Sequence, residues 1–207
     1  MRRSLAVALL LAGLTGCGAG SATPDSSPGD GYFGAVLDQQ YTAPDITLAA
    51  TTGPSYNLRT STTKPLTLVF FGYTKCPDVC AAVMSSLTSA LTRLDDAQRD
   101  QVQVLFVTTD PARDTTAVLQ QWLSAFDPTF VGLTGPLEEI VAAGKAFHVY
   151  VSDGAKLPSG GYDVAHGSEV IAINAHDRTP IVWTEGTSSA EFASDIFRLL
   201  DQPLENS

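Results

Sequence analysis

Two patterns of hydrophobic and polar positions alternate along most of this chain. Short, continuous apolar runs such as Leu66–Phe71 and Gln103–Val107 are typical of strands buried on both faces of a sheet. Between such runs, apolar residues recur every three or four positions, as in an amphipathic helix that buries one face. Strands that alternate with helices predict an α/β domain with a central, mainly parallel sheet flanked by helices.

The flanking residues define the other elements of this domain. A hairpin is expected over Ile46–Ala50 and Tyr56–Leu58, because turn residues separate the two runs. We expect helices at Val79–Leu94, from Asp114 or Thr115 to Phe126, at Pro136–Phe147, and after the capping box of Ser188 and Glu191. We expect further strands at His148–Val151, Ser168–Asn174 and Ile181–Thr184, the last two as an antiparallel pair.

A thioredoxin-like fold with an N-terminal β-hairpin fits this order of elements best. The alternative is a flavodoxin-like sheet, which would need a phosphate-binding loop after its first central strand. The chain instead has Gly-Tyr-Thr-Lys-Cys-Pro-Asp-Val-Cys at residues 72–80. Two of the three cysteines lie in this segment, so the end of that strand is the first place to look for chemistry.

The first 40 residues differ in composition from the rest of the chain. The apolar run Leu5–Leu14 follows two arginines, is too short to span a bilayer, and ends at Leu-Thr-Gly-Cys, residues 14–17. This tetrapeptide resembles the lipobox of bacterial lipoproteins, which implies that residues 1–16 are a signal peptide and that lipidated Cys17 anchors the protein to the outer face of a membrane. An ordinary secretory signal is the alternative. Small and polar residues predict a flexible tether over 17–40, followed by the folded domain over 41–203.

The charge balance excludes one class of partner. Lys and Arg number 12 against 22 for Asp and Glu, which gives a formal net charge of −10. Nucleic-acid binding needs clustered cations that displace counterions from phosphates, so we expect no nucleic-acid partner. A negative field also gives no attraction to anionic lipid, but it can steer a cationic partner or a metal ion.

The pair Cys76 and Cys80 lies at the predicted junction of strand and helix. Free backbone amides and the helix dipole favour anionic thiolates there. At this spacing the two sulfurs can converge on each other or on one ion. Three residues separate them, whereas thioredoxin-type exchange prefers two. A purely structural disulfide is the third interpretation, although so short a loop would contribute only about 2 kcal/mol.

The three histidines differ in their predicted surroundings. His166 immediately precedes a predicted buried strand, so it can share the sheet edge with the cysteine loop. His148 is expected to pack or to sit at a helix C-terminus, and His176 lies in a polar turn. We therefore select His166 as the third ligand. Two thiolates and one imidazole suit Cu(I), and also Cu(II), whereas a closed zinc site would want a fourth ligand.

Three parts of the chain now resemble the Sco/SenC family of copper-binding proteins. They are Phe70–Cys80, Thr109–Thr115 and His166. The resemblance extends over about Tyr41 to Gln202. It implies a thioredoxin-like fold, anchored to the membrane outside the cytoplasm, that binds copper through Cys76, Cys80 and His166 and helps to assemble the binuclear copper centre of cytochrome c oxidase.

The resemblance favours a metallochaperone over an enzyme. Its implied partners are the copper-site subunit of the oxidase, a thiol reductant and other copper chaperones. The alternative is an extracytoplasmic thiol-disulfide oxidoreductase that acts on the oxidase copper-site cysteines, with Cys76 attacking and Cys80 resolving. Asp78 is expected to cap the helix or to tune the site by its charge, and Asp110 with Arg113 to hold the loop through a salt bridge or to dock a partner.

Two positions depart from the usual family pattern. Ala81 replaces a proline after the second cysteine, a change that favours the helix. Ala165-His166-Gly167 replaces Asp-His-Ser or Asp-His-Thr, which removes a carboxylate able to orient the imidazole. A role in copper scavenging or resistance is therefore a further alternative.

Overall fold

The computed structural model describes residues 31–156 and 163–204. The predicted signal peptide, Cys17 and the tether up to residue 30 lie outside the described residues. Within the described ranges, no helix combines the length and the apolar character needed to cross a membrane.

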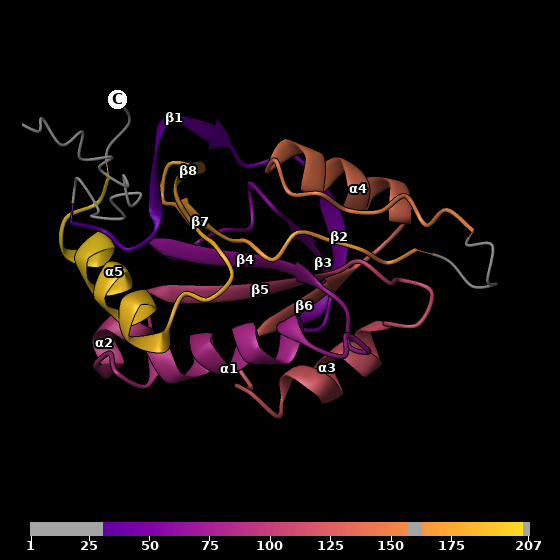
Figure 1. Ribbon diagram of the computed structural model, residues 1–207, viewed down its shortest axis with the longest axis horizontal. Coiled ribbons are helices and arrows are strands. Elements are labelled where there is room, and N and C mark those ends of the chain that lie inside the picture. The colour runs from indigo at the N-terminus through magenta and orange to yellow at the C-terminus, as the bar shows by residue number, and fades with distance from the viewer. Residues whose placement is uncertain (1–30, 157–162, 205–207) are drawn as a thin grey trace, which may run out of the picture.

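The strands form one eight-stranded sheet in the order β1-β8-β7-β4-β5-β6-β2-β3 (Figure 1). Their bounds are β1 Ala35–Thr42, β2 Thr47–Ala50, β3 Gly53–Asn57, β4 Leu66–Gly72, β5 Val102–Thr108, β6 Val131–Thr134, β7 Val170–Asn174 and β8 Arg178–Trp183. The predicted α/β class is confirmed. The parallel part is smaller than expected, because in the described sheet only the β4–β5 and β5–β6 pairs are parallel.

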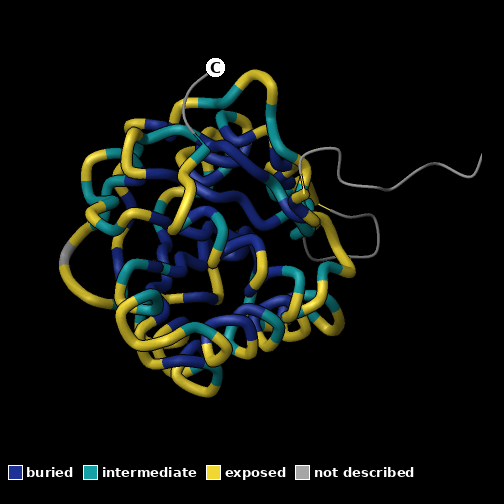
Figure 2. The backbone as a smooth tube through the Cα atoms, turned by 90° about the vertical axis from the view of Figure 1, so that its left-hand side faces the viewer, coloured by how far each residue is buried: buried dark blue, intermediate teal, exposed yellow. Residues whose placement is uncertain are grey.

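Helices cover both faces of the sheet. They are α1 Val79–Leu91, α2 Asp96–Arg99, α3 Thr116–Leu123, α4 Leu137–Ala146 and α5 Ser189–Asp201. Figure 1 shows α1, α3 and α5 on one side and α4 on the other. The buried backbone forms the middle of the molecule, whereas exposed segments lie mainly at its periphery (Figure 2).

The two faces of β4 explain the two hydrophobic cores. All seven residues of this strand are buried, and successive side chains point to opposite faces. Leu68 and Phe70 pack into the core beneath α1 and α5, whereas Val69 and Phe71 pack into the core beneath α4. The continuous apolar run seen in the sequence therefore follows from burial on both sides.

The folded domain begins before residue 41. Strand β1 begins within the range 17–40 expected to be a tether, and it pairs with β8 at the sheet edge. Ahead of it, Tyr32 is buried, and the amides of Phe33 and Gly34 donate hydrogen bonds to the buried carboxylate of Asp195 at 2.8–3.0 Å. This anchor on α5 fixes the point at which the N-terminal segment joins the domain.

The prediction of a strand over His148–Val151 is wrong. Val149 and Val151 are buried on either side of exposed Tyr150, which produces a strand-like pattern, but Val151 forms only an isolated bridge with His166. The preceding residue, His148, has a φ of 58° where the chain leaves α4. Strand β6 and the short helix α2 were not predicted.

The helix starts follow local capping chemistry. Thr115 is the N-cap of α3 and accepts a hydrogen bond from the amide of Val118. The predicted capping box of α5 is confirmed, because Ser188 and Glu191 exchange side chain to backbone hydrogen bonds. The other predicted candidate for the α3 cap, Asp114, is buried instead and contributes to the site described next.

Candidate metal-binding site

The structure brings Cys76, Cys80 and His166 together at one end of the central strands. One potential ligand atom from each lies within 4.8 Å of the other two. Both cysteines are free thiols, and Cys80 Sγ lies 3.5 Å from His166 Nε2. The other two histidines are elsewhere: His148 is exposed and stacks on Tyr41, and His176 lies in the turn between β7 and β8.

The cysteines are placed by the end of β4 and the start of α1. Cys76 lies in the connecting loop and is partly buried, whereas Cys80 is in the first turn of α1 and has no solvent exposure. Asp78 occupies the N-cap position of α1 but makes no side-chain capping bond. Its carboxylate is exposed, so the expected capping role is wrong.

His166 is held by contacts between two segments that are distant in sequence. The bridge between Val151 and His166 is flanked by hydrogen bonds from the Ser152 amide to the Ala165 carbonyl, at 2.9 Å, and from the Gly167 amide to the Tyr150 carbonyl, at 2.8 Å. The imidazole also meets the rings of Phe70 and Tyr73 edge to face, with centroids 6.0 and 5.7 Å away. These contacts direct the ring toward Cys80.

The hydrogen bond at Nδ1 defines the tautomer of His166. Nδ1 lies 2.6 Å from the carbonyl oxygen of Gly167, and a carbonyl can only accept, so Nδ1 carries the proton. Burial lowers the pKa of His166, which favours the neutral ring. Nε2 is therefore an unprotonated donor atom that faces Cys80 and is ready to bind a metal.

The two thiols have opposite electrostatic surroundings. Burial opposes ionisation of Cys76, but hydrogen bonds from backbone amides, those of Asp78 and Cys80 foremost, outweigh it and lower the pKa of Cys76. Burial raises the pKa of Cys80 strongly, and the nearby charges of Cys76 and Asp114 raise it further. Cys76 is thus the partly exposed cysteine that ionises more easily, and Cys80 is the buried cysteine that ionises less easily.

Asp114 supports the cysteine loop from the interior. Its fully buried carboxylate accepts hydrogen bonds from the amide of Thr74 at 2.9 Å, the hydroxyl of Thr74 at 2.6 Å and the hydroxyl of Thr108 at 2.7 Å. The expected salt bridge between Asp110 and Arg113 is present one turn earlier. The sequence did not predict that Asp114 would reach the loop.

Glu169 is a second acidic residue that the sequence did not single out. Within the described residues, its Oε2 atom is buried without a hydrogen-bond partner. The side chain folds back over Gly167, where any Cβ would collide with Oε2. The negative charge of Glu169 partly offsets the effect of burial on the pKa of His166. A carboxylate thus lies near the imidazole although Ala165 provides none.

Comparison with known proteins now identifies the family. The SCO1/SenC family model matches residues 36–201. The chain belongs to the SCO1/SenC family. The family match begins at residue 36, inside β1, and thus earlier than the domain start at residue 41 expected from the sequence.

Individual relatives match a smaller region. "Protein SCO2 homolog, mitochondrial" from Danio rerio is 42% identical over 108 residues, which cover 52% of this chain and 39% of the relative. The matched regions span between 36% and 50% of the first four curated relatives.

Solved structures of Sco proteins share the fold. Apo Sco1 from Thermus thermophilus superposes with a TM-score of 0.72 at 27% identity and covers 81% of this chain and 96% of its own. ScoI from Bradyrhizobium japonicum, solved with copper bound, gives a TM-score of 0.65 at 28% identity, over 76% of this chain and 98% of its own. The predicted thioredoxin-like fold is confirmed by these neighbours.

Proposed function

We propose that this protein is a copper metallochaperone, which binds one copper ion through Cys76, Cys80 and His166 and delivers it during assembly of the binuclear copper centre of cytochrome c oxidase. The observation that carries the proposal is the convergence of two sulfurs and one unprotonated imidazole nitrogen within 4.8 Å. This set of soft donors fits Cu(I), and Cu(II) is also accommodated by two thiolates and an imidazole. Family membership and the copper-bound relative support it.

The asymmetry of the thiols suits stepwise loading. Cys76 is partly exposed and loses its proton more easily than Cys80 does, so it can capture copper first. Cys80 must lose its proton when its sulfur binds the ion, and that proton passes to solvent. His166 then completes the site with Nε2 without any proton release, because this nitrogen is already unprotonated.

The cellular setting follows from the same proposal. The recipient is the copper-site subunit of the oxidase, other copper chaperones supply the ion, and a thiol reductant keeps the two cysteines reduced. Lipidation of Cys17 would place the protein outside the cytoplasm, anchored to the cell membrane.

A copper titration tests the ligand set. The reduced protein should bind one Cu(I) per chain in competition with a chromophoric chelator. Cys76→Ser should abolish tight binding and His166→Ala should weaken it, whereas the control His148→Ala should leave the affinity unchanged, because His148 is exposed and lies outside the cluster. Loss of affinity in the control equal to that in His166→Ala would refute the assignment.

The second candidate function is a thiol-disulfide oxidoreductase acting on the copper-site cysteines of the oxidase. The contrast between the partly exposed Cys76, whose pKa is lowered, and the buried Cys80, whose pKa is raised, favours it. Cys76 would attack the substrate disulfide and release one thiol, and Cys80 would resolve the mixed disulfide, which leaves a reduced substrate and an oxidised pair. Catalysed disulfide reduction by metal-free His166→Ala protein, together with no tight copper binding by the unmodified protein, would favour this function.

A further inference from the structure

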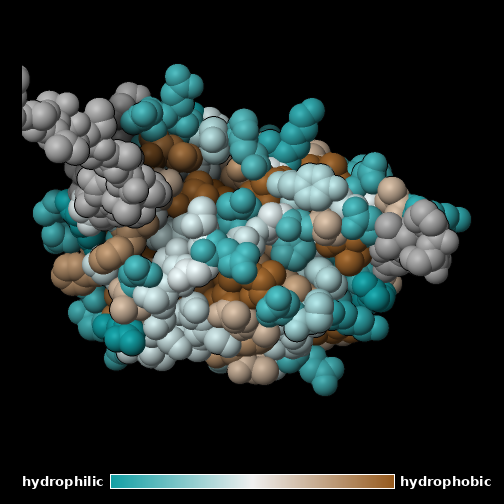
Figure 3. Space-filling view, viewed as in Figure 1, coloured by the Kyte–Doolittle hydropathy of each residue, from teal (hydrophilic) through white to brown (hydrophobic). Residues whose placement is uncertain are grey.

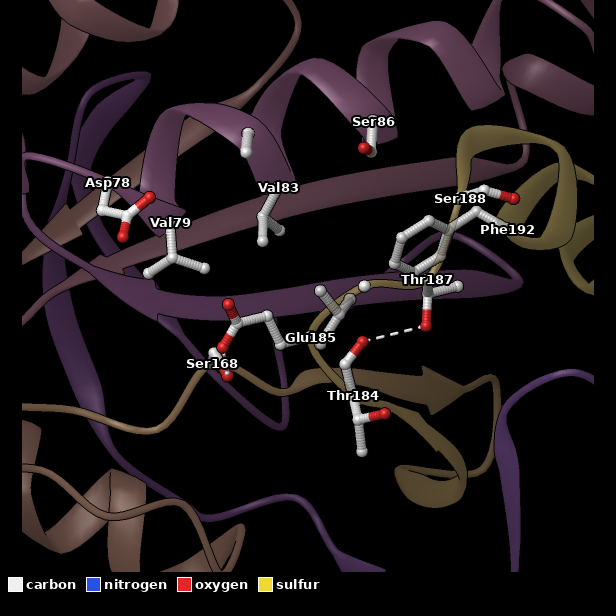
Figure 4. Close-up of a pocket in the computed structure, with 13 residues that line it drawn as sticks. Asp78, Val79, Val83, Ser86, Ser168, Thr184, Glu185, Thr187, Ser188 and Phe192 are labelled. Carbon is white, nitrogen blue, oxygen red and sulfur yellow. Dashed lines mark hydrogen bonds between the residues drawn. The ribbon is translucent and has the colours of Figure 1, made fainter. Parts of the chain in front are cut away.

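A groove of about 290 Å³ lies directly beside the metal-binding site. One wall is the first turns of α1, and the other is formed by Ser168, by the first residue of β7 and by the connection from β8 to α5 (Figure 4). We call it the α1–α5 groove. The space-filling view shows apolar side chains between hydrophilic ones on the face that carries α1 and α5 (Figure 3).

The groove is continuous with the loops that carry the ligands. Asp78 and Val79, which line it, lie between Cys76 and Cys80 in the chain, and Ser168 lies two residues after His166. A polypeptide in the groove would therefore touch both ligand-bearing segments. Cys76, the more exposed of the two cysteines, is two residues before Asp78 in the chain.

The lining has two chemical zones. Val83 and Phe192 are buried and supply an apolar floor, with Val79 partly exposed at the margin. The charged residues that line the groove, Asp78 and Glu185, are both acidic, and neither forms an ion pair within the part of the chain that the structure describes. Figure 4 shows their carboxylates at the same end, where the hydroxyl of Ser168 donates to Glu185 at 3.3 Å.

The exposed carboxylates of Asp78 and Glu185 determine which kind of ligand the groove favours. A like-charged segment would be repelled, whereas a Lys or Arg side chain would gain two partners there. The apolar floor accepts one hydrophobic side chain next to that cation. A contact this small gives weak, short-lived binding, which suits a protein that must release its partner after each delivery.

We propose that the α1–α5 groove is the docking surface for the copper recipient, which inserts a short segment with a Lys or Arg between Asp78 and Glu185 and an apolar side chain over Val83 and Phe192. This inference rests on the proposed metallochaperone function. Docking there brings the recipient's own ligands to the exposed side of Cys76, so that copper can pass between sulfurs without entering solvent.

Charge reversal at the groove tests the proposal by kinetics. Stopped-flow transfer of Cu(I) from the loaded protein to the reduced, copper-free soluble domain of the oxidase copper-site subunit is compared for Glu185→Lys and Glu138→Lys. Glu138 is an exposed acid on α4, across the sheet from the groove, so both variants change the net charge equally. Glu185→Lys should slow transfer about tenfold at low salt, and Glu138→Lys by less than about twofold. The difference should shrink in about 0.5 M salt.

Equal rates for the two variants would overturn the proposal, provided that the copper affinity of each equals that of the unmodified protein. A second measurement does not depend on copper transfer. Backbone amide signals of the ¹⁵N-labelled, reduced protein are followed as the unlabelled recipient domain is added. Shifts confined to the start of α1 and to residues 184–188 would support docking even if no copper is transferred and the metallochaperone function fails. Shifts elsewhere, or none, would refute it.

Discussion

Replacing Asp114 should loosen the cysteine loop while leaving the metal ligands themselves in place. Its carboxylate receives three hydrogen bonds, two from Thr74 and one from Thr108, and is fully buried. Hydrogen bonds to a charged group contribute about 1.5–3 kcal/mol each. In Asp114→Asn the hydroxyl of Thr74 can rotate to accept from the new amide, so the contacts remain but lose their charge. We expect the free energy of unfolding to fall by about 2–3 kcal/mol.

Urea and thermal unfolding of the reduced, copper-free protein measure this effect. A loss of that size corresponds to a fall in Tm of about 4–12 °C for a domain of this length. Thr74→Val is the matched control, because it removes one hydrogen bond to the same carboxylate and leaves its charge, at a cost of about 1.5 kcal/mol. If Asp114→Asn proves no more destabilising than Thr74→Val, the charge of Asp114 does not hold the loop.

Two further predictions concern the chemistry of the site. In the reduced, copper-free protein, iodoacetamide should modify Cys76 before Cys80, because the pKa of Cys76 is lowered and that of Cys80 is raised. Since the thiolate is the reactive form, the Cys76 rate should level off at a lower pH than the rate of a free cysteine does. Equal rates, read from digested peptides by mass spectrometry, would contradict this. Glu169→Gln should lower the ratio of Cu(II) to Cu(I) affinity about tenfold, because a fixed negative charge near His166 favours the more positive ion. A ratio unchanged from that of the unmodified protein in paired titrations would show that the carboxylate does not act on the metal.

The central strands and the long helices could be predicted because burial determines their patterns. The edge strand β1 could not, since its residues are exposed or only half-buried and its register shifts between Val36 and Tyr41. Such a strand depends on its pairing with β8, which local sequence does not encode. Its neighbours Phe33 and Gly34 are fixed by Asp195, more than 160 positions away.

The site, like the fold, could be predicted only in part from the sequence. The spacing of Cys76 and Cys80 and the place of His166 before a strand were enough to predict that the three could meet. Asp114 looked like a helix cap, because nothing in its neighbourhood indicates contact with Thr74, 40 positions earlier. Glu169 drew no attention, since its importance depends on how its side chain folds back over the glycine beside His166.

The fold holds the two halves of the site with unequal strength. Cys80 is buried in α1 against the end of β4, so moving it would disturb the main hydrophobic core. His166, by contrast, lies outside the named strands and is held by one isolated bridge, two flanking hydrogen bonds and edge-to-face contacts with Phe70 and Tyr73. Segments with few buried contacts open locally at a lower free energy than core helices do. We therefore expect the His166 side of the site to open more readily than the Cys80 side, which would suit the proposed release of copper to a recipient.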